Sequence, residues 1–265
     1  VYGSSVFTKE APLEFEKNIY EYALSQMGRT VKNDEIPDEL FQQYMVNRGL
    51  RDVNGKGVLT GLTNISEIIS FEERDGKRIP VDGQLWYRGY NVEKLISMFG
   101  DDRFGYEALT YLLLFGELQD AGQREDFLKI LSEARDLPTN FVRAVIMKAP
   151  TKDIMNSMTR SILTLASYDQ YAQQTDLGNV IRQSIMLIAT FPMLAIYGYH
   201  AYNHYENLES MYIHRPDPEM STAENILMML RPDRKFTATE AKVLQAALLL
   251  HMEHGGGNNS TFTTR

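Results

Sequence analysis

The sequence predicts an almost entirely α-helical protein with one small β-hairpin. Three observations favour this fold. Apolar residues recur at helical spacing along most of the 265 residues, glycine and proline punctuate these segments, and only one stretch alternates as a pair of strands would. Because 43% of the residues are hydrophobic and 23% are charged, the chain can form a sizeable core.

The helical pattern divides into segments with recognisable ends. A proline precedes the second segment, Asn91 is a suitable N-cap, and Gly28, Gly100 and Gly116 are suitable stops. Pro192 is expected to kink the longest segment. We expect helices over residues 12–27, 38–48, 92–99, 106–115, 123–135, 139–148, 153–167 and 178–202.

Two capping boxes mark further helices in the last third of the chain. Ser221 is followed by Glu224, and Thr237 by Glu240, each three residues later. In this arrangement the hydroxyl accepts a backbone N–H while the glutamate reaches back to the first residue. Both motifs predict a helix that begins at the next residue.

One segment, at about residues 58–88, has strand character. Residues 58–73 contain β-branched side chains in alternation, Arg74-Asp75-Gly76-Lys77 is a turn sequence, and residues 79–87 are again extended. We therefore predict a small hairpin inserted between helices.

Composition excludes several classes of function. The chain has 27 Lys and Arg against 35 Asp and Glu, a net charge of −8, which argues against nucleic acid as a partner. The absence of cysteine excludes disulfides and thiol catalysis and fits a reducing compartment, so we expect a cytoplasmic protein. The apolar stretch 185–201 contains Pro192 and is interrupted by tyrosine and histidine side chains, so no membrane span is expected.

The most informative segment is the end of the chain, residues 251–265. It contains His251 and His254, three glycines, Asn258 and Asn259, and a run of hydroxyls. Imidazole, amide and hydroxyl donors beside exposed backbone can hold a small polyanion. A helix C-cap followed by a polar tail is the alternative, and it stays open for Gly255 and for the hydroxyl run.

The helix that begins after Thr237 is expected to continue to His254. Its residues Val243, Ala247, Leu250 and His254 fall on one line, which we expect to face the core. The two histidines are three residues apart, whereas the metalloprotease helix needs His-Glu-x-x-His, so no metal site is expected.

Several ordered blocks follow one another from residue 83 to residue 261. They are residues 83–95 with Trp86-Tyr87-Arg88-Gly89-Tyr90, residues 106–118, the loop at 215–217 with the helix at 223–230, and His-x-x-His-x-x-x-Asn-x-Ser-Thr from residue 251. Together these blocks resemble the citrate synthase family. That resemblance implies a nearly all-α fold with a large and a small domain, and the condensation of oxaloacetate with acetyl-CoA to give citrate and CoA.

The resemblance also implies roles for residues of the terminal block. His254 and Asn258 match residues that bind oxaloacetate, and His251 matches a histidine that supports the site from behind. Oxaloacetate and acyl-CoA would be the substrates, with no cofactor. The family further implies a homodimer, to which we expect segments 153–167 and 178–202 to contribute.

The family's Gly-Pro-x-His-Gly and Gly-x-Gly-His-type motifs, which carry its catalytic histidine and aspartate, do not occur in residues 1–265. The resemblance therefore implies that 1–265 is a partial large domain, inactive alone and without catalytic residues of its own. Because the chain begins at Val1 and ends at Arg265, we expect a proteolytic product. A non-catalytic helical binding or scaffold protein is the alternative, and the choice between acetyl-CoA and propionyl-CoA stays open.

Overall fold

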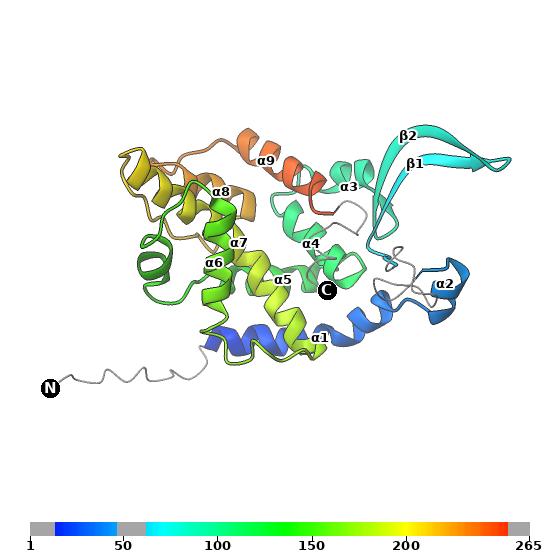
Figure 1. Cartoon of the computed structure of the whole chain (residues 1–265), viewed down its shortest axis with the longest axis horizontal. Coiled ribbons are helices and arrows are strands. Elements are labelled where there is room, and N and C mark those ends of the chain that lie inside the picture. Colours follow the sequence, from blue (N-terminus) through cyan, green and yellow to red (C-terminus); the bar gives the residue numbers. More distant parts are fainter. Residues whose placement is uncertain (1–13, 47–61, 254–265) are drawn as a thin grey trace. The chain divides into compact units, whose positions relative to one another are not determined.

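The computed structural model describes residues 14–46 and 62–253, and it confirms a mainly helical fold with a small antiparallel sheet (Figure 1). The elements follow in the order α1 (Glu14–Asp34), α2 (Asp38–Gln43), β1 (Ser66–Arg74), β2 (Lys77–Tyr87), β3 (Tyr90–Asn91), α3 (Val92–Phe99), α4 (Gly105–Phe115), α5 (Ala121–Glu133), the π-helix η1 (Val142–Ile146), α6 (Ile154–Leu165), α7 (Leu177–Glu206), α8 (Thr222–Leu230) and α9 (Ala238–Leu250).

These elements form two compact units, each assembled from several stretches of chain. Unit 1 comprises Val1–Met27, Glu125–Met220 and Asn225–Lys235, and unit 2 comprises Gly28–Arg124, Ser221–Glu224 and Phe236–Arg265.

Unit 1 is organised around the 30-residue helix α7. Its most apolar 18-residue window has a mean hydropathy of 1.5, so by length and composition alone the helix could cross a membrane. Half of that window is buried by protein, as in a core helix. The buried side chains of α7 also include the polar Asn179, Arg182, Thr190, His200 and Asn203.

A polar network fixes the start of α7. Asp176 caps the helix by accepting the N–H of Asn179 at 3.0 Å. The buried guanidinium of Arg182 pairs with Asp169 at 2.6 Å, and it donates to the amide oxygen of Asn179 at 2.8 Å. These bonds tie the loop after α6 to the first turns of α7, and they satisfy a charge that would be costly to bury alone.

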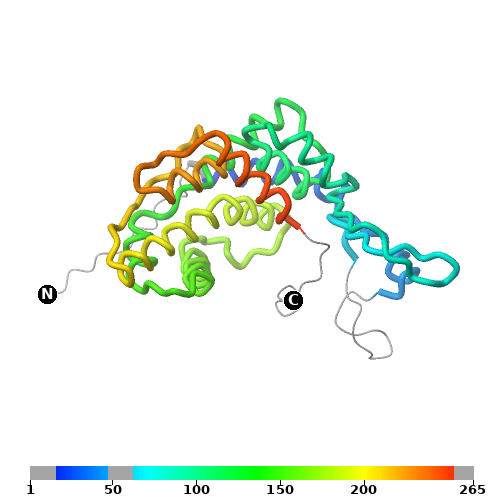
Figure 2. The backbone as a smooth tube through the Cα atoms, turned by 90° about the horizontal axis from the view of Figure 1, so that it is seen from above, coloured from blue at the N-terminus to red at the C-terminus, as the bar shows by residue number. Residues whose placement is uncertain are grey.

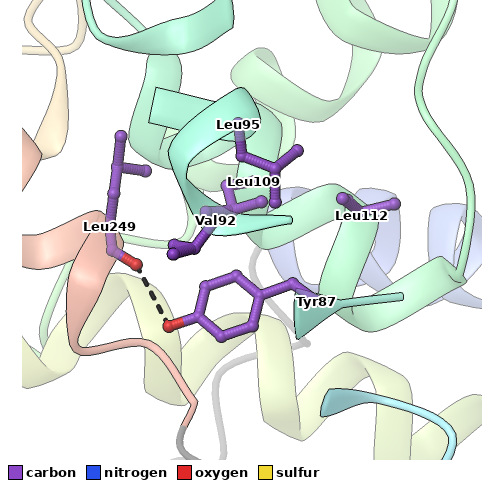
Figure 3. Packing of buried hydrophobic residues seen from close by; sticks show 6 residues of the cluster. All are labelled: Tyr87, Val92, Leu95, Leu109, Leu112 and Leu249. Carbon is purple, nitrogen blue, oxygen red and sulfur yellow. Dashed lines mark hydrogen bonds between the residues drawn. The ribbon is translucent and has the colours of Figure 1, made fainter. Parts of the chain in front are cut away.

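Unit 2 has a compact apolar core where the sheet meets three helices (Figure 3). Its buried members come from β2, α3, α4 and α9 and are Tyr87, Val92, Leu95, Leu109, Leu112 and Leu249. The predicted helix ends around this core are confirmed. Asn91 accepts the N–H of Glu93 at 2.9 Å, and Gly116 ends α4 with a φ of 78°.

The predicted hairpin is present, and its strands run over Ser66–Arg74 and Lys77–Tyr87, within the predicted segment 58–88. Asp75 and Gly76 both have positive φ, as a two-residue type I′ turn requires. The register pairs Ser66 with Tyr87, and a bulge interrupts it between Ile69 and Phe71. In two views the hairpin runs outward from α3 and α4 (Figure 1, Figure 2). A second turn adds the unpredicted short strand β3.

Three expected boundaries were wrong. Helix α1 continues through Gly28 to Asp34, and Arg29 on this extension contacts Tyr111 and Glu117, so tertiary contacts outweigh the helix-breaking tendency of glycine. Helix α2 ends at Gln43, before Met45 with its positive φ. Within the expected segment 139–148, only Val142–Ile146 is helical, and it is a π-helix.

Both capping boxes are confirmed. At α8, Ser221 donates its N–H to Glu224 at 2.8 Å and its hydroxyl accepts the Glu224 N–H at 3.3 Å. At α9, Thr237 and Glu240 make the same reciprocal pair.

The buried face of α9 differs from the predicted one. Val243 is 66% exposed and Leu250 is 44% exposed, whereas Gln245 and Leu249 are buried. The Gln245 amide donates to the carbonyls of Phe99 at 3.2 Å and Asp102 at 2.7 Å, and it accepts the N–H of Tyr106 at 3.4 Å. The helix therefore turns a glutamine inward because that glutamine satisfies the backbone between α3 and α4.

We predict that Gln245→Val destabilises the protein by about 2 kcal/mol, because it removes three hydrogen bonds of a buried side chain, those to the carbonyls of Phe99 and Asp102 and that from the N–H of Tyr106. The matched change Val243→Gln, on the exposed face of the same helix, should cost less than about 0.5 kcal/mol. Urea unfolding followed by fluorescence of Trp86, the single tryptophan, measures both values. An equal or larger loss for Val243→Gln would contradict the orientation of α9.

Gly116→Ala should also destabilise, by about 2 kcal/mol, because alanine is strained at positive φ. A Cβ at this position would lie 2.6 Å from the Cβ of Asn33. The control is Gly122→Ala, whose Cβ would meet its nearest neighbouring atom, in Asp120, at 3.5 Å. The same unfolding experiment should show little loss for the control, and a similar loss in both variants would refute the explanation.

Candidate functional site

The candidate site lies where the described part of α9 ends. The expected continuation of the helix to His254 is wrong, because the helix ends at Leu250 and His251 is its C-cap. His254 and Asn258, the two predicted oxaloacetate-binding residues, lie outside the described residues. Residues 249–253 and their contacts form the part of the structure that directly precedes them.

His251 folds back on its own helix. Its side chain is exposed, and its Nδ1 lies 2.6 Å from the carbonyl oxygen of Ala247. This contact is a hydrogen bond when Nδ1 carries the hydrogen, and it then satisfies one of the free carbonyls at the helix end. In that tautomer Nε2 is left as an acceptor.

Tyr87 holds the end of α9 from inside the core. Its side chain is fully buried, and its hydroxyl lies 3.3 Å from the carbonyl oxygen of Leu249 (Figure 3). The same hydroxyl lies 3.3 Å from the carbonyl oxygen of Leu250 and 2.9 Å from that of Glu253. The same oxygen accepts the N–H of Glu253 at 3.3 Å. One phenol thus satisfies both backbone groups of the residue that precedes His254.

Burial raises the pKa of the Tyr87 phenol above its ordinary value, with the nearby carboxylate of Glu253 adding to the effect, while backbone hydrogen bonds act in the opposite direction. The hydroxyl therefore keeps its hydrogen throughout the neutral range and remains a donor to the helix end.

Arg88, the next residue, fixes the position of Tyr87. Its nearly buried guanidinium pairs with Asp34 at 2.6 Å and donates to the carbonyl of Leu113 at 2.8 Å and to Asn64 at 3.0 Å. Arg88 and Gly89 both have positive φ, so the turn between β2 and β3 reverses tightly and leaves Tyr87 pointing into the core.

A second clamp holds the middle of α9. Arg124 pairs with both carboxylate oxygens of Asp102 at 2.6 Å, and the hydrogen bond from this guanidinium holds the pKa of Asp102 below its ordinary value. The carbonyl of Asp102 accepts the Gln245 amide described above. Helix α9 is therefore fixed at its start by Thr237, in its middle by Gln245 and at its end by Tyr87.

An open hollow of about 430 Å³ beside α9 does not suit a small dianion. It is lined mainly by apolar atoms of α3 and α9, and the charges there, Lys242 and Asp101, pair with each other at 2.7 Å. In residues 14–46 and 62–253 there is also no group of three His, Asp or Glu that could hold a metal ion.

The other described histidines serve packing in unit 1. The buried ring of His200 meets the Met229 carbonyl at 3.0 Å, and His214 meets the Arg231 carbonyl at 3.1 Å. His204 contacts the carbonyl of Glu209 at 2.8 Å.

Sequence reasoning missed the role of Tyr87. The residue lies in the block 83–95 that carried the family resemblance, yet no spacing rule connects it with a helix more than 150 positions later. The sequence held only a local signal. Tyr87 is the large aromatic residue directly before Arg-Gly, and alternation along a strand can point such a residue into the core.

Comparisons with known proteins agree with one family. The family model described as "Citrate synthase, C-terminal domain" matches residues 50–265. A citrate synthase of Saccharolobus solfataricus is 26% identical over 210 residues, covering 79% of this chain and 48% of the relative. A 2-methylcitrate synthase of Shewanella oneidensis is 26% identical over 185 residues, covering 68% and 44%.

Solved structures show the same fold. The citrate synthase of Pyrobaculum aerophilum superposes with a TM-score of 0.60 at 24% identity, covering 75% of this chain and 46% of that one. That of Thermotoga maritima gives 0.57 at 21% identity, covering 78% and 47%. The chain spans about half the length of the curated relatives it matches. With a family model matching most of its residues, this chain belongs to the citrate synthase family.

Proposed function

We propose that this chain is the oxaloacetate-binding part of the large domain of an enzyme that condenses oxaloacetate with an acyl-CoA. The family match over residues 50–265 carries the proposal, because it includes the whole terminal block. The anchored end of α9 supports it, since Tyr87 fixes the backbone of Glu253, the residue before His254.

In this proposal His254 and Asn258 donate hydrogen bonds to oxaloacetate, and His251 supports the helix end behind them. Oxaloacetate carries two carboxylates and a ketone, and all three accept hydrogen bonds. Imidazole and amide donors held on a fixed backbone are suited to such a substrate. The acyl-CoA is a substrate, and no cofactor is required.

The reaction needs further groups. A carboxylate base removes a proton from the α-carbon of the acyl group, which is next to the thioester carbonyl. This α-carbon forms a bond with the ketone carbon of oxaloacetate, and the ketone oxygen takes up a proton. Water then cleaves the thioester and releases CoA. We propose that the base and the second histidine belong to sequence outside residues 1–265, and that the active protein is a cytoplasmic homodimer.

We predict that residues 1–265 alone do not release CoA, whereas the complete gene product does. A thiol-release assay with oxaloacetate and either acetyl-CoA or propionyl-CoA tests both statements and identifies the preferred acyl group. Turnover by residues 1–265 alone would refute the assignment of the catalytic groups. An inactive complete gene product would favour a scaffold protein.

In the active gene product, His254→Ala should lower kcat/KM by about 100-fold, because a donor to the substrate is lost. His204→Ala is the matched control, since this histidine contacts the carbonyl of Glu209 at a distance of 2.8 Å and belongs to a packing region of unit 1. Steady-state kinetics with varied oxaloacetate measures both variants. An unchanged kcat/KM in His254→Ala would rule out its binding role.

A further inference from the structure

We propose that Tyr87 is a positioning residue for oxaloacetate binding: its hydroxyl sets the path of the backbone from Leu249 to Glu253, and thereby the starting point of the terminal block. This inference rests on the proposed function. Tyr87 has no contact with substrate in it, and acts only through the main chain that it holds.

The geometry at the hydroxyl is unusual for a packing tyrosine. A buried phenol needs one acceptor, whereas this oxygen lies within 3.3 Å of three acceptors at the helix end, the carbonyls of Leu249, Leu250 and Glu253. It also receives the N–H of Glu253. The contact therefore defines where α9 stops and in which direction the chain leaves it.

The anchor itself is rigid. Tyr87 lies in the last pair of the β1–β2 register, opposite Ser66, and it pairs across the next turn with Tyr90. Arg88 adds an ion pair with Asp34 and hydrogen bonds to two further segments. A displacement of the helix end would have to break the phenol contacts, because the strand side of the contact cannot follow.

Removal of the phenol oxygen should therefore loosen the backbone only at the end of α9. In Tyr87→Phe the ring still fills the core, but the hydrogen bonds between the hydroxyl and the two backbone groups of Glu253 are lost. We expect the KM for oxaloacetate to rise about ten-fold in the active gene product, whereas the KM for acyl-CoA changes less than two-fold.

Two control variants separate positioning from stability. Thr237→Ala removes the cap at the opposite end of α9 and should lower Tm by a similar amount, with no change in the KM for oxaloacetate. Tyr90→Phe alters a 37% exposed tyrosine in the same turn and should change neither value. Fluorescence of Trp86 reports Tm, and hydrogen exchange of residues 1–265 should show faster exchange around Glu253 in Tyr87→Phe alone.

The outcomes separate the two proposals. If the wild-type gene product shows no condensation, the proposed function is wrong and the role of Tyr87 falls with it. If the wild type is active and Tyr87→Phe keeps its KM for oxaloacetate, or raises the KM values for oxaloacetate and acyl-CoA alike, only the positioning role is overturned. A selective rise in the oxaloacetate KM, with faster exchange at Glu253, supports it.

Discussion

The buried hydroxyl of Tyr87 is the interaction on which the described part of the site depends. It joins the sheet to the end of α9 by hydrogen bonding with backbone groups that find no partner within the helix itself. The core around the ring is apolar, and the hydroxyl is the polar group that this tyrosine brings to the helix end. Tyr87 thus combines two tasks, filling the core with its ring and ending a helix with its oxygen.

Around this contact the structure repeats one device, in which a polar side chain reaches the backbone of a distant segment. Gln245 satisfies the carbonyls between α3 and α4, and Arg88 satisfies the end of α4. In unit 1, Asn179 donates to the carbonyls of Tyr171 and Gln174 in the loop before α7, and Arg182 holds the amide oxygen of Asn179. Hydrogen bonds of this kind are directional, so they fix the orientation of a segment as well as its burial. Apolar packing alone specifies orientation less well.

Local chemistry could be read from the sequence, and long-range contacts could not. The caps at Asn91, Ser221 and Thr237 were predictable because each motif is complete within four residues. The buried face of α9 was predicted wrongly because the hydrophobic pattern made Gln245 a surface residue. Its burial depends on hydrogen bonds to carbonyls more than 140 residues earlier, and no periodicity contains that information. The family resemblance was read correctly because it rests on ordered blocks and not on periodicity.

The long hairpin leads to a different consequence. Strand β1 is at the edge of the sheet order β1-β2-β3, so within the described residues its outer backbone groups have no neighbouring strand. Exposed edges of this kind invite pairing with other chains. Here the pairing register of β1 with β2 shifts between Ile69 and Phe71, and Glu72, Glu73 and Arg74 place charges at the outer end of the strand. The hairpin can therefore extend into solvent with its own protection against aggregation.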